Sequence, residues 1–292
     1  MREIAFIGLG SMGLPMAINL AKAGYAVRGF DMRRAAMDAL VDHGGSACDD
    51  IGAACSGLDT LFLMVVNADQ AAEILFDGGA LDALAPGSTV CLMSTCPPGA
   101  VESLAERVGI AGHAFVDCPV SGGVAGAQGA TLTMMAACPA DLFAAIRPAL
   151  TVMGSKLYHV GEKPGQGAVV KSINQLLCGV HLAAAAEAMA LGGKVGLDRD
   201  VLLEIVGGSA ASSWMLRDRG PRLLQADPGI TSTVDIFVKD LGIVMEAGRD
   251  AKAAVPLAAL AHQLFLAASG AGDGAADDSQ VIRSYQRLNA MG

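Results

Sequence analysis

Six residues near the N-terminus have the spacing of a phosphate-binding turn. Gly8, Leu9, Gly10, Ser11, Met12 and Gly13 follow a short apolar run and lead into an alanine-containing stretch with helical spacing. In a strand-turn-helix unit, glycines permit the tight turn and the close approach of a phosphate, and the start of the helix presents free N–H groups. The pattern alone is weak evidence, but its place directly after a strand predicts a dinucleotide pyrophosphate site.

Asp31 ends the next apolar run, 18 residues after Gly13, near the spacing of an acid that binds the ribose of NAD. A carboxylate there accepts from both ribose hydroxyls and repels a 2'-phosphate. We therefore predict NAD, with Asp31 and its neighbour Met32 as cofactor-binding residues. Two alternatives stay open: Asp31 only caps a helix that begins near Arg33, or Arg33 and Arg34 receive the 2'-phosphate of NADP.

The elements that position these residues alternate in type. An α/β fold is predicted, with a doubly wound Rossmann domain at 1–162 followed by an all-α substrate and oligomerisation domain at 163–292. Strands are expected at 4–7, 26–30, 60–65, 89–93, 114–118, 131–136 and 156–160, with helices such as 13–23 and 68–75 between them. Residues 168–195 contain almost no helix breaker and predict one long helix that joins the two domains. Further helices are expected at 199–206, 213–224, 236–252, 255–268 and 278–288, and a loop at 269–276.

Charge and cysteine content narrow the class of protein. A formal net charge of -9 disfavours nucleic acid and anionic membranes as partners, because both are bound by clustered lysine and arginine. The seven cysteines are scattered, without a CxxC pair or zinc spacing, and indicate reduced thiols in a cytoplasmic protein with no metal site. The apolar run at the N-terminus is too short for a signal peptide or a membrane span.

Five ordered motifs resemble the β-hydroxyacid dehydrogenase family, which includes 3-hydroxyisobutyrate, tartronate semialdehyde and threonate dehydrogenases. The resemblance covers nearly the whole chain. The motifs are Gly8 to Gly13 with Pro15, Ser94-Thr95, Asp117-Cys-Pro-Val-Ser-Gly-Gly123, Gly165-Gln-Gly-Ala-Val-Val-Lys171-Ser-Ile-Asn174 and Lys239-Asp240-Leu241. Stretches 175–181, 213–215 and 234–240 resemble the threonate branch most closely, although Asn174 stands where that branch tends to carry histidine.

This resemblance implies roles for residues that would touch a substrate. Ser121, Gly122 and Gly123 are expected to hold its carboxylate, and consecutive glycines do allow backbone N–H groups to converge on an anion. Lys171 is expected to carry the hydroxyl proton, which requires a pKa lowered from about 10.4 toward 7 or 8. Asn174, one helical turn later, is expected to orient the substrate. The alternatives are an ordinary Gly-Gly turn and a solvated surface lysine.

Further roles concern the nicotinamide end of the cofactor and the wall of the pocket. Lys239 is expected to approach both nicotinamide and substrate, unless it forms only a surface pair with Asp240. Thr95 is expected beside the nicotinamide ribose, and Val65 and Val66 beneath the cofactor. Trp214 is expected to close one side of the substrate pocket, unless it is simply a core residue.

The predicted activity is NAD-dependent oxidation of a small hydroxy acid, most closely a four-carbon sugar acid such as L-threonate, to its 2-oxo acid. A 3-hydroxyisobutyrate dehydrogenase and a tartronate semialdehyde reductase are the nearest alternatives. A non-catalytic NAD-binding scaffold is the alternative from another class, and intact Lys171 and Asn174 argue against it. Apolar helices in the second domain predict a homodimer or homotetramer.

Overall fold

The computed structural model describes residues 3–290, and its contacts divide the chain into two compact units, Met1–Lys171 and Ser172–Gly292. The division falls inside a helix and lies after residue 162, where the sequence suggested a boundary. The reason is local: the start of that helix hydrogen-bonds to the sheet of the first unit through Asp117.

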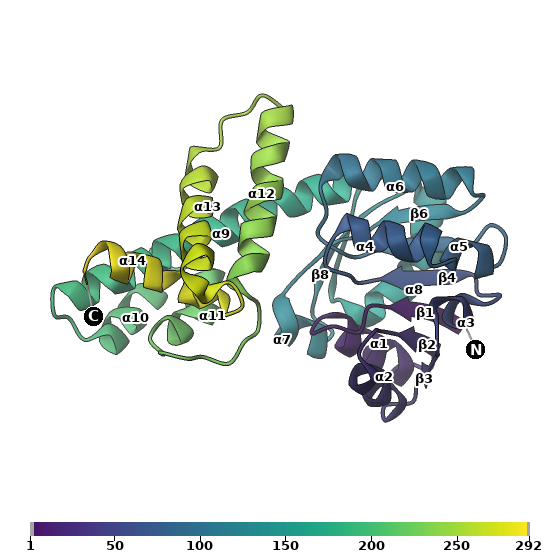
Figure 1. The fold of residues 1–292 in the computed structure, drawn as a ribbon, viewed down its shortest axis with the longest axis horizontal. Coiled ribbons are helices and arrows are strands. Elements are labelled where there is room, and N and C mark those ends of the chain that lie inside the picture. Colours follow the sequence, from purple (N-terminus) through teal and green to yellow (C-terminus); the bar gives the residue numbers. More distant parts are fainter. Residues whose placement is uncertain (1–2, 291–292) are drawn as a thin grey trace. The chain divides into compact units, whose positions relative to one another are not determined.

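The first unit is a nine-stranded sheet in the order β3-β2-β1-β4-β5-β6-β8-β7, with β9 beside β8 (Figure 1). The strands are β1 (Glu3–Ile7), β2 (Ala26–Phe30), β3 (Ser46–Ala47), β4 (Thr60–Leu63), β5 (Thr89–Leu92), β6 (Ala114–Asp117), β7 (Val120–Ser121), β8 (Thr133–Ala137) and β9 (Lys156–Gly161). Pairing is parallel from β3 to β6, whereas β8 runs antiparallel to β6 and β7. The order reverses between β1 and β4, so the turn after β1 lies at the switch point where doubly wound sheets bind ligands.

Helices cover both faces of this sheet. They are α1 (Gly13–Lys22), α2 (Arg34–Val41), α3 (Ile51–Cys55), α4 (Ala68–Ala72) with the π-helical turn η1 (Glu73–Asp77), α5 (Ala80–Ala83), α6 (Pro98–Ile110), α7 (Gly123–Gln128) and α8 (Ala140–Met153). Alternate residues of each strand point to opposite faces: Phe6 packs in the core with α1, α2 and α8, and Ile7 in the core with α3 to α6. Strands buried on both faces are expected of a parallel sheet.

The parallel register aligns the carboxyl ends of the central strands. Ile7 pairs with Phe30 and Leu63, Leu63 with Leu92, and Leu92 with Asp117. Residues that follow these strands therefore share one edge of the sheet. This edge carries every predicted site residue of the first unit except Lys171, which lies on a helix.

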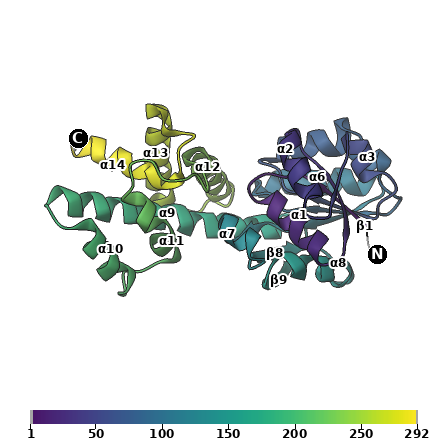
Figure 2. The same cartoon turned by 90° about the horizontal axis from the view of Figure 1, so that it is seen from below.

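The second unit is built on helix α9 (Gln166–Lys194), which contributes its residues from Ser172 onward. The other elements are α10 (Arg199–Gly207), α11 (Trp214–Leu223), α12 (Val234–Asp250), α13 (Pro256–Ala268), the π-helical turn η2 (Ser269–Asp273), the 3-10 turn η3 (Asp278–Val281) and α14 (Ile282–Leu288). Helices α10 and α11 lie on one side of α9, and α12 and α13 on the other (Figure 2). Leu182, Ala186 and Met189 of α9 pack in one core with Phe237 and Phe265, whose rings stack at 4.8 Å.

Within the described residues, α9 is long and apolar enough to cross a membrane by length and composition, with a mean hydropathy of 1.5 in its most apolar window. Nearly half of that window, 44%, is buried inside the protein. The core helix of a globular protein meets the same criteria, and the packing of α9 is of that kind.

The α/β class and all seven expected strands are confirmed, and so are the expected helices of the second unit. The structure departs from the sequence predictions in several places. It adds the two-residue strands β3 and β7, the strand expected at 60–65 ends at Leu63, and β8 runs antiparallel to β6 and β7. Residues 269–276 are not only a loop, because the chain continues α13 as a π-helical turn, which breaks at Gly272 with φ +96°.

Candidate active site

The turn after β1 is shaped by contacts that only glycine allows. Gly8 has φ +92°, and a Cβ there would meet the carbonyl oxygen of Met64 at 2.3 Å. A Cβ on Gly13 would meet the carbonyl oxygen of Gly8 at 1.9 Å. Gly10 differs, because an added Cβ would find only the Arg33 guanidinium, at 4.0 Å. The open side at Gly10 and the start of α1, which has no side-chain cap, fit a dinucleotide phosphate.

Asp31 braces this turn. Its Oδ2 accepts a 2.8 Å hydrogen bond from the N–H of Leu9, and its Oδ1 accepts from the N–H of Arg33 at 2.9 Å. Burial raises the pKa of Asp31, but hydrogen bonds from Arg33 and Leu9 outweigh burial and hold the pKa below its ordinary value. Helix α2 begins at Arg34 with no side-chain cap. Asp31 is therefore more than a helix cap, because it joins the end of β2 to the glycine turn.

Arg33 lies against the same carboxylate. Its Nε donates to Asp31 Oδ1 at 3.0 Å and its Nη2 to the carbonyl oxygen of Leu9 at 2.9 Å, while its side chain is 63% exposed. Met32 between them is almost fully exposed. The acid expected to bind the ribose of NAD and an arginine that could bind the 2'-phosphate of NADP thus lie side by side, directly after β2.

The ends of β4 and β5 are joined at this edge. The N–H of Val65 donates to Ser94 Oγ at 2.9 Å, and Ser94 is buried. Val66 is exposed, and its N–H donates to Gln70 Oε1 at 3.0 Å. Thr95 directly after Ser94 is half-buried. Val65, Val66 and Thr95 therefore lie on the carboxyl side of the strands next to β1.

The segment after β6 contains two consecutive glycines with positive φ angles. Ser121 pairs with Thr133 of β8, and then Gly122 and Gly123 adopt φ +136° and +63°. Only glycine adopts such angles in succession without strain. Helix α7 starts at Gly123. The sequence prediction of a special Gly-Gly turn is thus supported by the backbone angles.

Lys171 is buried, with 6% of its surface exposed, in the second turn of α9. This differs from the solvated surface lysine that was the alternative. The start of its helix is held by Asp117, whose Oδ2 accepts from the N–H groups of Gly165 at 2.9 Å and Ala168 at 3.0 Å. Sequence reasoning missed Asp117, because only the fold brings it to a helix about fifty residues later.

Asn174, Lys239 and Trp214 are the predicted site residues of the second unit. Asn174 is half-buried on α9, one turn after Lys171. Lys239 Nζ lies 2.8 Å from Asp240 Oδ1, and the buried Asp240 accepts from Gln175 Nε2 at 2.6 Å. The lysine is 25% exposed, so this is not a solvated surface pair.

Trp214 is not a core residue, because 47% of its surface is exposed. It begins α11, where Ser213 Oγ accepts from the N–H of Leu216 at 3.0 Å. The Arg219 guanidinium lies 5.9 Å from the centre of its ring.

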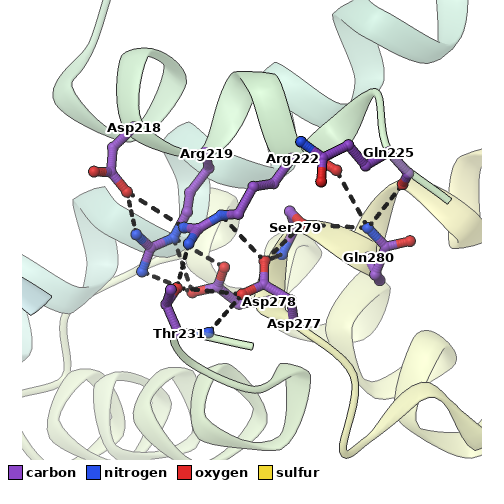
Figure 3. Close-up of polar contacts among 9 residues, drawn as sticks. All are labelled: Asp218, Arg219, Arg222, Gln225, Thr231, Asp277, Asp278, Ser279 and Gln280. Carbon is purple, nitrogen blue, oxygen red and sulfur yellow. Dashed lines mark hydrogen bonds and ion pairs between the residues drawn. The ribbon is translucent and has the colours of Figure 1, made fainter. Parts of the chain in front are cut away.

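A buried ion-pair network fixes α11 and therefore Trp214 (Figure 3). Arg219 Nε donates to Asp278 Oδ1 at 2.9 Å, and Arg222 Nε lies 3.4 Å from Asp277 Oδ1. Asp218 accepts from both arginines. Burial raises the pKa of Asp278 to about 6, whereas hydrogen bonds from Thr231 and Ser279 outweigh burial at Asp277 and lower its pKa.

No cluster of three or more histidine, cysteine or acidic side chains suited to a metal ion occurs among residues 3–290.

Comparison with known proteins agrees with this architecture. Residues 3–161 match the model of the NAD binding domain of 6-phosphogluconate dehydrogenase. Residues 165–285 match the family described as NAD-binding of NADP-dependent 3-hydroxyisobutyrate dehydrogenase. Together they define an NAD(P)-dependent oxidoreductase that acts on CH–OH groups.

Individual relatives are similar over the full length. An L-threonate dehydrogenase of Cupriavidus necator is 43% identical, with 100% of this chain and 98% of the relative aligned. A 3-hydroxyisobutyrate dehydrogenase of Pseudomonas aeruginosa is 38% identical over 91% of both chains. The crystal structure of 3-hydroxyisobutyrate dehydrogenase from Salmonella typhimurium matches with a TM-score of 0.92 and 37% identity, covering 97% of this chain and 99% of that one. The chain belongs to the 3-hydroxyisobutyrate dehydrogenase-like family of β-hydroxyacid dehydrogenases.

Proposed function

We propose that this dehydrogenase oxidises a four-carbon sugar acid such as L-threonate to its 2-oxo acid with NAD. The observation that carries the proposal is the 43% identity over the whole chain to a relative named L-threonate dehydrogenase. The 38% identical 3-hydroxyisobutyrate dehydrogenase supports that acid as the second candidate substrate. Reduction of tartronate semialdehyde is the third candidate, and a non-catalytic scaffold is the candidate from another class.

Lys171 is proposed to take up the proton of the substrate hydroxyl. Oxidation of a secondary alcohol removes a hydride from carbon and a proton from oxygen, so a base within hydrogen-bond reach of the hydroxyl is required. The burial of Lys171 on a helix braced by Asp117 supports this role, because a fixed amine keeps its distance to the substrate.

Ser121, Gly122 and Gly123 are proposed to hold the substrate carboxylate with the serine hydroxyl and backbone N–H groups. The successive positive φ angles support this assignment. Asn174 is proposed to orient the substrate and Trp214 to border it.

The cofactor is proposed to be NAD in preference to NADP. Bound NAD supplies the hydride acceptor. Gly8 to Gly13 hold its pyrophosphate, Asp31 its ribose, and Met32, Val65, Val66 and Thr95 line the same edge. Asp31 accepts from Leu9 and Arg33 in this structure, and the salt bridge to Asp31 offsets the attraction of Arg33 for a 2'-phosphate. Lys239 is proposed to contact the nicotinamide end and the substrate.

We further propose a cytoplasmic homodimer or homotetramer. The seven cysteines are all free thiols, as expected in a reducing compartment. Helix α9 leaves Ile173, Leu177 and Leu191 exposed, Val195 directly after it is exposed too, and apolar side chains in such a row are usually covered by a partner.

The test is a panel of hydroxy acids assayed with NAD by absorbance at 340 nm. L-threonate is expected to give the highest kcat/KM, above 3-hydroxyisobutyrate, L-serine and glycerate. A higher kcat/KM for 3-hydroxyisobutyrate would replace the proposed substrate by the second candidate. Turnover of none of them, with NAD binding intact, would favour the scaffold.

A further inference from the structure

Asp117 is a buried carboxylate, and the proposed function uses it only as a brace for the start of α9. It is the last residue of β6, and only 1% of its surface is exposed. Its neighbours in the sheet are Leu92 of β5 and Ala137 of β8. A buried charge is costly unless it is hydrogen-bonded, so the partners of this carboxylate identify what it does.

The partners are N–H groups at the start of α9. Asp117 Oδ2 accepts from Gly165 at 2.9 Å and from Ala168 at 3.0 Å. The first N–H groups of a helix have no partner inside the helix and are usually capped by a neighbouring side chain. Here the capping side chain, Asp117, belongs to strand β6 and not to the helix, so its hydrogen bonds join α9 to the sheet.

Close packing makes this joint stiff. A Cβ on Gly167 would meet the carbonyl oxygen of Met135 at 2.6 Å and Asp117 Oδ2 at 2.9 Å. The helix backbone thus lies directly on β8 and on the carboxylate, with no side chain between them. Lys171 follows Ala168 by three residues, a rise of about 4.5 Å along the helix.

The same residue also fixes the glycine loop. Only three residues separate Asp117 from Ser121, and Ser121 is paired to Thr133 of β8. The loop that binds the carboxylate in the proposed function and the helix that carries Lys171 are therefore both attached at the end of β6.

The backbone hydrogen-bond donors around Asp117 favour its ionised form. Burial raises the pKa of Asp117 to about 6, while the N–H groups of Ala168, Gly165 and Gly167 limit that rise. The titratable groups near it are the thiols of Cys91 on β5, Cys118 after β6 and Cys138 after β8, with Glu102 of α6 beside Gly165.

We propose that Asp117 is a positioning residue, which sets the distance between the Lys171 amine and the carboxylate loop by clamping the first turn of α9 to the end of β6. The proposal rests on the function proposed above for Lys171. It gives the acid in the Asp117-to-Gly123 segment a function of its own, separate from the serine and glycines.

Asp117→Asn is the main test, because the amide keeps one oxygen for the two N–H groups but loses the negative charge. Weakening the clamp is expected to lower kcat by about 10- to 100-fold, since displacement of a reacting group by about 1 Å has effects of that size. The dissociation constant for NAD is expected to stay within about two-fold of wild type. The limb of the kcat/KM pH profile that reports Lys171 is expected to move to lower pH, because a nearby negative charge has been removed.

Two other variants separate positioning from loss of stability. Gly167→Ala pushes the helix from the sheet without changing charge, and is expected to lower kcat with the pH limb unmoved. It also provides the test if Asp117→Asn does not fold. Ser88→Ala is the matched control, because Ser88 is buried at the amino end of β5 and bonds to His113 at 2.8 Å. It is expected to lower the melting temperature and leave kcat unchanged.

The outcomes distinguish this inference from the proposed function. Wild-type kcat in both Asp117→Asn and Gly167→Ala, with Lys171→Ala inactive, would overturn the positioning role and leave the function standing. A lower kcat in Asp117→Asn with an unmoved pH limb, together with wild-type kcat in Gly167→Ala, would assign Asp117 to stability alone and also overturn it. Full activity of Lys171→Ala would overturn the function itself.

Discussion

Replacement of Asp31 by alanine tests how the first unit selects its cofactor. Asp31 is 12% exposed at its side chain and accepts a 2.8 Å hydrogen bond from Leu9 and three from Arg33. In the proposed complex the carboxylate also accepts from the ribose hydroxyls. A charge-assisted hydrogen bond of this kind contributes about 1.5 to 3 kcal/mol. Its loss is therefore expected to raise the dissociation constant for NAD by about 10- to 150-fold.

The same substitution is expected to favour NADP. Without the carboxylate, the negative charge that repels a 2'-phosphate is gone, and the Arg33 guanidinium is released to bind it. The ratio of kcat/KM for NAD to that for NADP is expected to fall by at least about 100-fold, and fluorescence titration gives the binding constants directly.

Asp38→Ala is the matched control for Asp31→Ala. Asp38 pairs with Arg34 on the helix that follows the same strand, but both side chains are more than half exposed. An exposed pair of this kind contributes less than about 1 kcal/mol, so NAD binding is expected to stay within about two-fold. Binding of NAD by folded Asp31→Ala with wild-type affinity would refute the assignment of Asp31 to the ribose.

Three further predictions concern backbone and burial. Gly13→Ala is expected to abolish NAD binding or folding, because its Cβ would lie 1.9 Å from the carbonyl oxygen of Gly8, whereas Gly99→Ala, with open space around it, is expected to bind NAD normally in the same titration. Gly122→Ala is expected to raise KM for the hydroxy acid at least about 10-fold with little change for NAD, because φ +136° strains any other residue, and an unchanged KM would exclude the loop from carboxylate binding. Because burial raises the pKa of Asp117 from 3.8 to about 6, its contribution to stability is present below about pH 4 and lost as the pH rises through 6. The free energy of unfolding of Asp117→Asn, measured with urea, is therefore expected to rise by about 1 kcal/mol relative to that of wild type between pH 5 and pH 7. A difference between the two proteins that does not change with pH would contradict the raised pKa.

The sequence predicted the parts of the fold that depend on local patterns. Apolar runs marked every strand of four or more residues, and in β1, β4 and β5 burial on both faces leaves a continuous apolar stretch. The two-residue strands β3 and β7 carry too few residues for such a signal. The reversed strand β8 could not be recognised, because strand direction depends on pairing and not on composition.

Site residues were predictable where a role needs a special residue type. The glycines at 8, 13, 122 and 123 stand where space or backbone angles exclude other residues. The clamp by Asp117 and the bond from Gln175 to Asp240 were not predictable, because each joins residues about 50 or 65 positions apart. No spacing rule along the chain reports contacts of that range.

The most direct test of the account is Lys171→Ala, measured for NAD binding and for turnover of L-threonate in the same preparation. The account predicts a dissociation constant for NAD close to wild type and a kcat lower by at least about 100-fold. An unchanged kcat would show that the buried lysine does not carry the hydroxyl proton, and would contradict the account at its centre.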